Sequence, residues 1–71
     1  MKLTIDPDAD ALYFTLGDAE IVDSEQVAPG VVLDYDALEN VVGVELLNLS
    51  KRVPRADTQR LLFETLATVS R

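Results

Sequence analysis

The chain has 71 residues, with 13 acidic and 6 basic side chains and a formal net charge of −7. A chain of this length forms one small domain, and 48% hydrophobic residues are too many for a disordered protein. Cysteine and histidine are both absent, which excludes disulfide bonds, thiolate nucleophiles, zinc fingers, imidazole bases and Ser-His-Asp triads.

The first fifty residues predict an antiparallel β-sheet. Apolar residues alternate with polar or small ones, and turn residues such as Asp6-Pro7 and Pro29-Gly30 separate the runs. The third run is the most polar, so we expect an irregular or edge strand there. Because the connections are short, the strands pair as antiparallel hairpins and form a meander of four or five strands. The expected strands cover residues 3–5, 11–16, 21–27, 31–35 and 41–47.

The C-terminal part changes from strand to helix periodicity. Asp57 is a typical N-cap, and apolar residues then recur at helical spacing over about three turns. The apolar arc of this helix is wider than one sheet needs, so we expect the surplus to contact a second subunit. The expected interface residues are Leu61, Leu62, Phe63, Leu66, Ala67 and Val69. The predicted fold class is therefore α+β, with one antiparallel sheet and one C-terminal helix.

Charge divides this single domain, residues 1–71, into two parts. Residues 1–50 hold eleven acids and one base, whereas residues 51–71 hold five bases and two acids. The boundary at Ser50 marks a change of structural element, because 21 residues are too few for a second domain.

Three segments together resemble the prokaryotic family called domain of unknown function 2283. They are D-P-D-A-D-A-L-Y-F at 6–14, P-G-V-V-L-D-Y-D at 29–36 and N-V-V-G-V-E-L-L-N-L-S-K-R at 40–52. The chain departs from the family at Glu39-Asn40, where many members have a glycine-bearing turn, and in its longer tail. The resemblance implies a small α+β domain of antiparallel strands with no established activity or catalytic residues. Some members are similar to the small partner proteins of toxin–antitoxin-like pairs.

Two acidic clusters are the candidates for chemistry. Asp6, Asp8 and Asp10 begin like a calcium loop, but Ala11 replaces the required glycine and Gly17 the required glutamate. We therefore interpret them as a hairpin turn and expect no metal site.

The second cluster, Asp34, Asp36 and Glu39, follows the fourth strand. In a meander it lies at the opposite end of the sheet from the first cluster. We expect solvated turn residues, no catalytic residues and no cofactor, because a raised carboxyl pKa requires burial.

These features predict a small acidic interaction module that is not an enzyme. No apolar run approaches the ~20 residues that span a membrane, and no signal peptide opens the chain, so we expect a cytoplasmic protein without membrane contact. The negative charge opposes nucleic acid binding, although Lys51, Arg52, Arg55 and Arg60 form a basic group. Since a chain this small lacks disulfides, we expect a homodimer or higher homo-oligomer. Two alternatives remain: an antitoxin-like partner of a basic protein, and a carboxylate-based metal binder or small enzyme.

Overall fold

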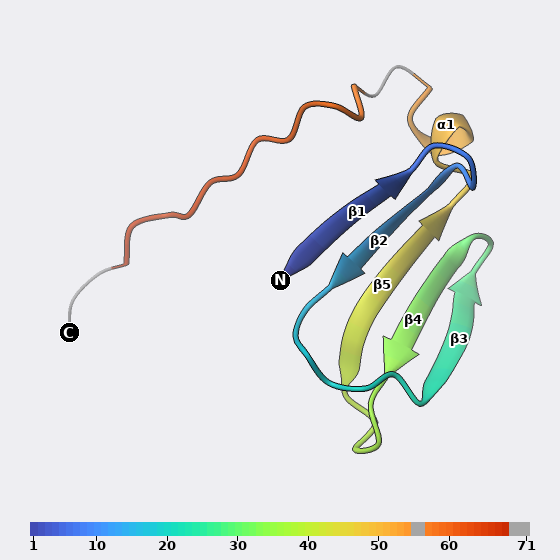
Figure 1. The fold of residues 1–71 in the computed structure, drawn as a ribbon, viewed down its shortest axis with the longest axis vertical. Coiled ribbons are helices and arrows are strands. Elements are labelled where there is room, and N and C mark those ends of the chain that lie inside the picture. The colour runs from blue at the N-terminus through green and yellow to red at the C-terminus, as the bar shows by residue number, and fades with distance from the viewer. Residues whose placement is uncertain (55–56, 69–71) are drawn as a thin grey trace.

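Alternating residues build five strands, as the sequence predicts. The computed structural model describes residues 1–54 and 57–68, and all strand pairs in it are antiparallel (Figure 1). The α+β fold class with an antiparallel sheet is thus confirmed. The strands are β1 (Lys2–Asp6), β2 (Ala11–Thr15), β3 (Asp23–Ala28), β4 (Val31–Tyr35) and β5 (Val41–Leu47).

The strand order, β1-β2-β5-β4-β3, differs from that of a simple meander. After β2, residues 16–22 cross to the far edge of the sheet, and two hairpins then return the chain to β2 (Figure 1). The link is long enough because residues span up to ~3.4 Å each and strands lie ~4.8 Å apart. This order gives the centre of the sheet to the apolar β5.

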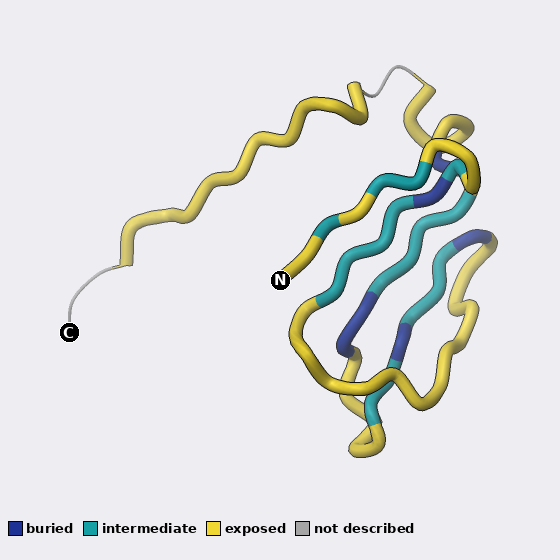
Figure 2. The backbone as a smooth tube through the Cα atoms, in the orientation of Figure 1, coloured by how far each residue is buried: buried dark blue, intermediate teal, exposed yellow. Residues whose placement is uncertain are grey.

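The most polar strand occupies an edge, as expected. Every residue of β3 is exposed, and its register with β4 shifts between Gln26 and Ala28 (Figure 2). An edge strand with charged residues and a bulge resists pairing with further strands. Among the residues that the structure describes, the buried ones are few and lie outside β3: Ala11, Gly30, Asp34, Val42, Gly43 and Leu49.

The turn between β3 and β4 depends on a glycine. Gly30 has φ +71°, its N–H donates to the Gln26 side-chain oxygen at 3.0 Å, and its carbonyl accepts from the Leu47 N–H. Arg52 crosses above this turn: its Nε donates to the Leu47 carbonyl at 2.9 Å and its guanidinium donates to the Pro29 carbonyl. The arginine thereby ties the C-terminal part of the chain to the β3–β4 hairpin.

The described residues contain one helix, α1 (Leu49–Arg52), which follows β5 after Asn48. It begins eight residues before Asp57, where the spacing predicted a helix to start. The prediction of a helix from Asp57 is wrong for residues 57–68. Asp57 does accept the Gln59 N–H at 3.0 Å, but the turn ends after the Arg60 N–H bonds to the Asp57 carbonyl. Short helices without tertiary packing are marginal in water, and beyond Leu61 the described chain leads away from the sheet (Figure 1).

Replacing Gly30 tests the turn. We expect Gly30→Ala to lower the free energy of unfolding by about 1–2 kcal/mol, because alanine disfavours positive φ. A Cβ there would also lie 2.6 Å from the Arg52 guanidinium and 3.2 Å from the Leu47 oxygen. Urea unfolding measures the change. The matched control is Gly17→Ala, whose Cβ would meet no atom within 4 Å; equal loss in both variants would refute this account of the turn.

Candidate functional site

One face of the sheet carries two continuous rows of apolar side chains. Paired residues of antiparallel strands point to the same face, so the register fixes each row. The first row crosses Ile5, Leu12, Leu46 and Val31, and the second crosses Leu3, Phe14, Val44 and Leu33. We call these eight residues the apolar face. Its side chains come from four strands that the tertiary fold alone brings together.

No second layer covers the apolar face in the described chain. All eight residues are half-buried, in the strands that Figure 2 colours mostly as intermediate. No large side chain among the described residues is fully buried. Leu49 of α1, which lies at one end of the sheet, is more deeply buried than these eight residues, with 7% of its surface exposed. The face is therefore a large apolar surface that water still reaches, which is typical of an interaction site.

The opposite face of the sheet is polar. Thr4, Tyr13, Glu45 and Gln26 lie on one row across it, interrupted by Val32. Apolar and polar residues are thus separated between the two faces, as in antiparallel sheets that bury one side.

Asp34 departs from the expectation of a solvated turn residue. It lies on the polar face within β4, only 5% exposed, and its Oδ1 accepts a hydrogen bond from the Ser24 hydroxyl at 2.7 Å. Its carboxylate occupies the space beside Gly43, where a Cβ would be 2.8 Å from Oδ2. A hydrogen bond to Asp34, then burial and the Asp34 charge, raise the pKa of Glu45. The sequence alone did not predict the burial of Asp34, because the pairing of Asp34 with Gly43 becomes visible only when the strand register is known.

The other members of the two acidic clusters stabilise turns. Asp6 Oδ1 accepts the N–H groups of Asp8 and Ala9 at 3.0 and 3.1 Å. Asp36 Oδ1 accepts those of Leu38 and Asn40, both at 2.9 Å. The turn interpretation of these carboxylates is confirmed, and the two clusters do lie at opposite ends of the sheet (Figure 1). Glu39, with φ 64°, completes the second turn.

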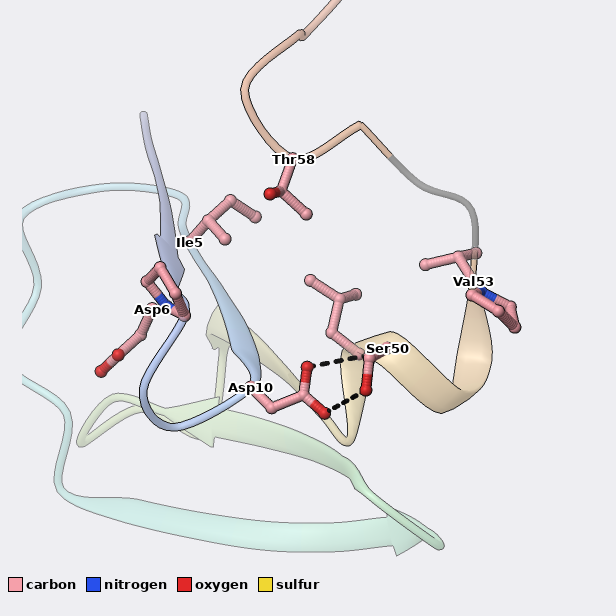
Figure 3. A pocket seen from close by; sticks show the side chains of 9 residues that line it. Ile5, Asp6, Asp10, Ser50, Val53 and Thr58 are labelled. Atoms are coloured by element: carbon pink, nitrogen blue, oxygen red, sulfur yellow. Dashed lines mark hydrogen bonds between the residues drawn. The ribbon is translucent and has the colours of Figure 1, made fainter.

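Asp10 contacts residues far from it in the sequence, which the interpretation as a turn residue did not predict. Its carboxylate accepts the Ser50 N–H at 2.9 Å and the Ser50 hydroxyl at 2.7 Å, while its carbonyl accepts the Leu49 N–H (Figure 3). These donors belong to the first turn of α1, whose own N-cap, Asn48, makes no side-chain capping bond. Asp10 therefore caps α1 from the β1–β2 turn.

A small cavity of about 220 Å³ adjoins this cap, with Ile5 and Thr58 of the tail on one side and Val53 on the other (Figure 3). Its wall is shared between the β1–β2 turn, α1 and the tail. Within residues 1–54 and 57–68, no three side chains of histidine, cysteine, aspartate or glutamate are grouped to hold a metal ion.

The predicted interface residues of the tail reach water. Leu61 is 67% exposed, and Leu62, Phe63 and Leu66 are 78–79% exposed. Ala67 is exposed as well, and Val69 lies outside the described residues. Leu61 also lines a cavity of about 170 Å³ with Leu3, Ile5 and Leu12, so the tail begins beside the apolar face.

The sequence profile of the family described as "Protein of unknown function (DUF2283)" matches residues 2–50. The match covers the five strands and the start of α1 and leaves out the tail. No curated protein and no solved structure matched the chain. Within the described residues, no helix is long and apolar enough to cross a membrane.

The Asp10 cap predicts a dependence of stability on pH. Hydrogen bonds from the Ser50 hydroxyl and backbone N–H lower the pKa of Asp10. The stabilisation is therefore complete above the unfolded-state pKa of about 3.9 and is lost as pH falls through the lower folded-state pKa. We expect Asp10→Asn to be less stable than the natural chain at pH 7, with the difference shrinking at pH 3 and below.

Urea unfolding at several pH values measures this difference. Asp8→Asn is the matched control in the same turn, because Asp8 contributes its backbone N–H to the turn. A stability difference for Asp10→Asn that stays constant from pH 7 to pH 2 would contradict the cap.

Proposed function

The chain belongs to the DUF2283 family of proteins of unknown function, and we propose that it is a small acidic interaction module whose apolar face binds a second copy of the chain. The observation that carries the proposal is the pair of uninterrupted apolar rows on a sheet that no second layer covers within residues 1–54 and 57–68. The proposed assembly is a homodimer in which two sheets pack face to face.

Folding energetics favour such a second layer. Domains bury the apolar side of a sheet against another element, because half-wet apolar side chains give up much of their hydrophobic stabilisation. The buried apolar residues of the described chain, Ala11, Val42 and Leu49, form a very small core. With no cysteine in the chain, disulfides cannot compensate. A second copy supplies a complementary apolar surface of the same size.

The area of the face explains why the tail contributes to the same interface. Five strands of about five residues cover on the order of 400 Å² in projection, at ~4.8 Å between strands and ~3.3 Å per residue. A standard interface buries about 800 Å² on each partner. Leu61 lies beside the apolar face. Leu61 and the three apolar residues that follow it, Leu62, Phe63 and Leu66, are exposed and extend the face toward that size in the proposed dimer.

Binding of a basic protein is the second candidate. The net charge of −7 and the exposed Asp23 and Glu25 beside the apolar face favour a basic partner. The metal and enzyme alternatives gain no comparable support, since the Asp6 and Asp10 carboxylates bond to donors of the chain itself.

A charge placed in the middle of the apolar face tests the proposal. We expect the natural chain to be a dimer at tens of micromolar and Val44→Lys to be a monomer, because a lysine would be desolvated between the sheets. Light scattering coupled to gel filtration measures the masses. Thr4→Lys adds the same charge to an exposed position of the opposite face and should leave the dimer intact.

Circular dichroism establishes that both variants keep the sheet. Phe14→Lys provides a second position if Val44→Lys fails to fold. A natural chain that is monomeric at this concentration would refute self-association, and equal dimerisation of all variants would remove the apolar face from the interface.

The tail is tested separately. We expect Leu62→Ser/Phe63→Ser to raise the dimer dissociation constant about tenfold, because two apolar contacts of the tail would be lost. Analytical ultracentrifugation measures the constant. The control Glu64→Gln/Thr65→Ser changes the neighbouring residues without removing apolar surface. A dissociation constant equal to that of the natural chain would show that the tail lies outside the interface.

A further inference from the structure

We infer that the two copies face each other with β1 of one copy over β3 of the other. This inference rests on the proposed self-association and concerns the arrangement of the dimer. Its basis is the unequal charge at the two sides of the apolar face.

When two identical sheets pack face to face with their strands aligned, a twofold axis leaves two arrangements. A twofold axis parallel to the strands places β1 over the partner's β3. A twofold axis across the strands places every strand over its own copy, so β3 lies over the partner's β3. The central strand β5 faces its own copy in both arrangements, because it is third in the strand order.

The β3 side of the apolar face is acidic. Glu25 is paired with Leu33 and Asp23 with Tyr35, so both carboxylates point to the apolar face. Both residues are exposed, and with Asp36 and Glu39 they line a cavity of about 470 Å³ beside Tyr35. The second apolar row thus ends at β3 in the carboxylate of Glu25, whereas the first ends at Ala28.

The β1 side of the same face is not acidic. Its strand residues there are Leu3 and Ile5, and Arg60 and Asp57 of the tail line the adjoining cavity. Asp57 and Arg60 are both exposed and carry opposite charges, so this side has no net charge from them. It can therefore lie over Asp23 and Glu25 of the partner with a guanidinium close by.

Distances decide between the two arrangements. With β3 over β3, the four carboxylates would meet at the sheet spacing of ~10 Å, close to the Debye length of ~8 Å at physiological salt. With β1 over β3, the acidic pairs lie four strand spacings apart, ~19 Å, which is more than two Debye lengths. Repulsion therefore disfavours the first arrangement and is screened in the second.

Crosslinking of single-cysteine variants tests the arrangement, because the natural chain has no cysteine. Leu3→Cys and Glu25→Cys are prepared in the full chain, and light scattering first establishes that each remains a dimer. A short bis-maleimide then reacts with each variant alone and with a re-equilibrated mixture. Val44→Cys, on the central strand, is the positive control because it should crosslink to its own copy in either arrangement.

We expect crosslinked dimer to form in the mixture. We expect none when Leu3→Cys or Glu25→Cys reacts alone. Isotope labelling of one variant identifies the mixed product by mass. Crosslinking of Leu3→Cys or Glu25→Cys to its own copy, or no product in the mixture while Val44→Cys crosslinks, would overturn the arrangement and leave self-association standing. Variants and natural chain that are all monomeric would refute self-association itself.

Discussion

The apolar side of a single antiparallel sheet has to be removed from water, and the rest of this structure depends on that constraint. Two rows of aliphatic and aromatic residues cross four strands, and the described chain covers only one end of them, with Leu49. Hydrophobic stabilisation scales with the apolar area removed from water, so a half-wet face leaves a small domain with little stability of its own. Covering the apolar face with a second copy, as proposed, would therefore also stabilise the folded chain.

The C-terminal part is fixed to the sheet by polar contacts. Asp10 caps α1 from the β1–β2 turn, and Arg52 at the end of α1 donates to the Leu47 and Pro29 carbonyls. These contacts hold α1 at one end of the sheet, from which the tail leads away (Figure 1). They also give Arg52, one member of the basic group, a structural role at this end of the sheet.

The proposed function follows from this division between a fixed sheet and an exposed tail. A face that is apolar in its centre and acidic at β3 suits a partner with an apolar centre, and a second copy of the chain meets that requirement. The family profile matches residues 2–50, so the sheet lies within the matched part and the tail lies outside it. The proposed self-association would use both parts.

The sequence by itself determined the strands, their antiparallel pairing, the edge position of the polar third strand and the turn at Gly30. These are local properties, set by alternation over a few residues and by the φ that glycine permits. The tertiary structure decided the strand order, the burial of Asp34 beside Gly43, the cap of α1 by Asp10 and the absence of a helix in residues 57–68. Each of these depends on residues far apart in the chain, and helical spacing produces a stable helix only where another surface packs against it.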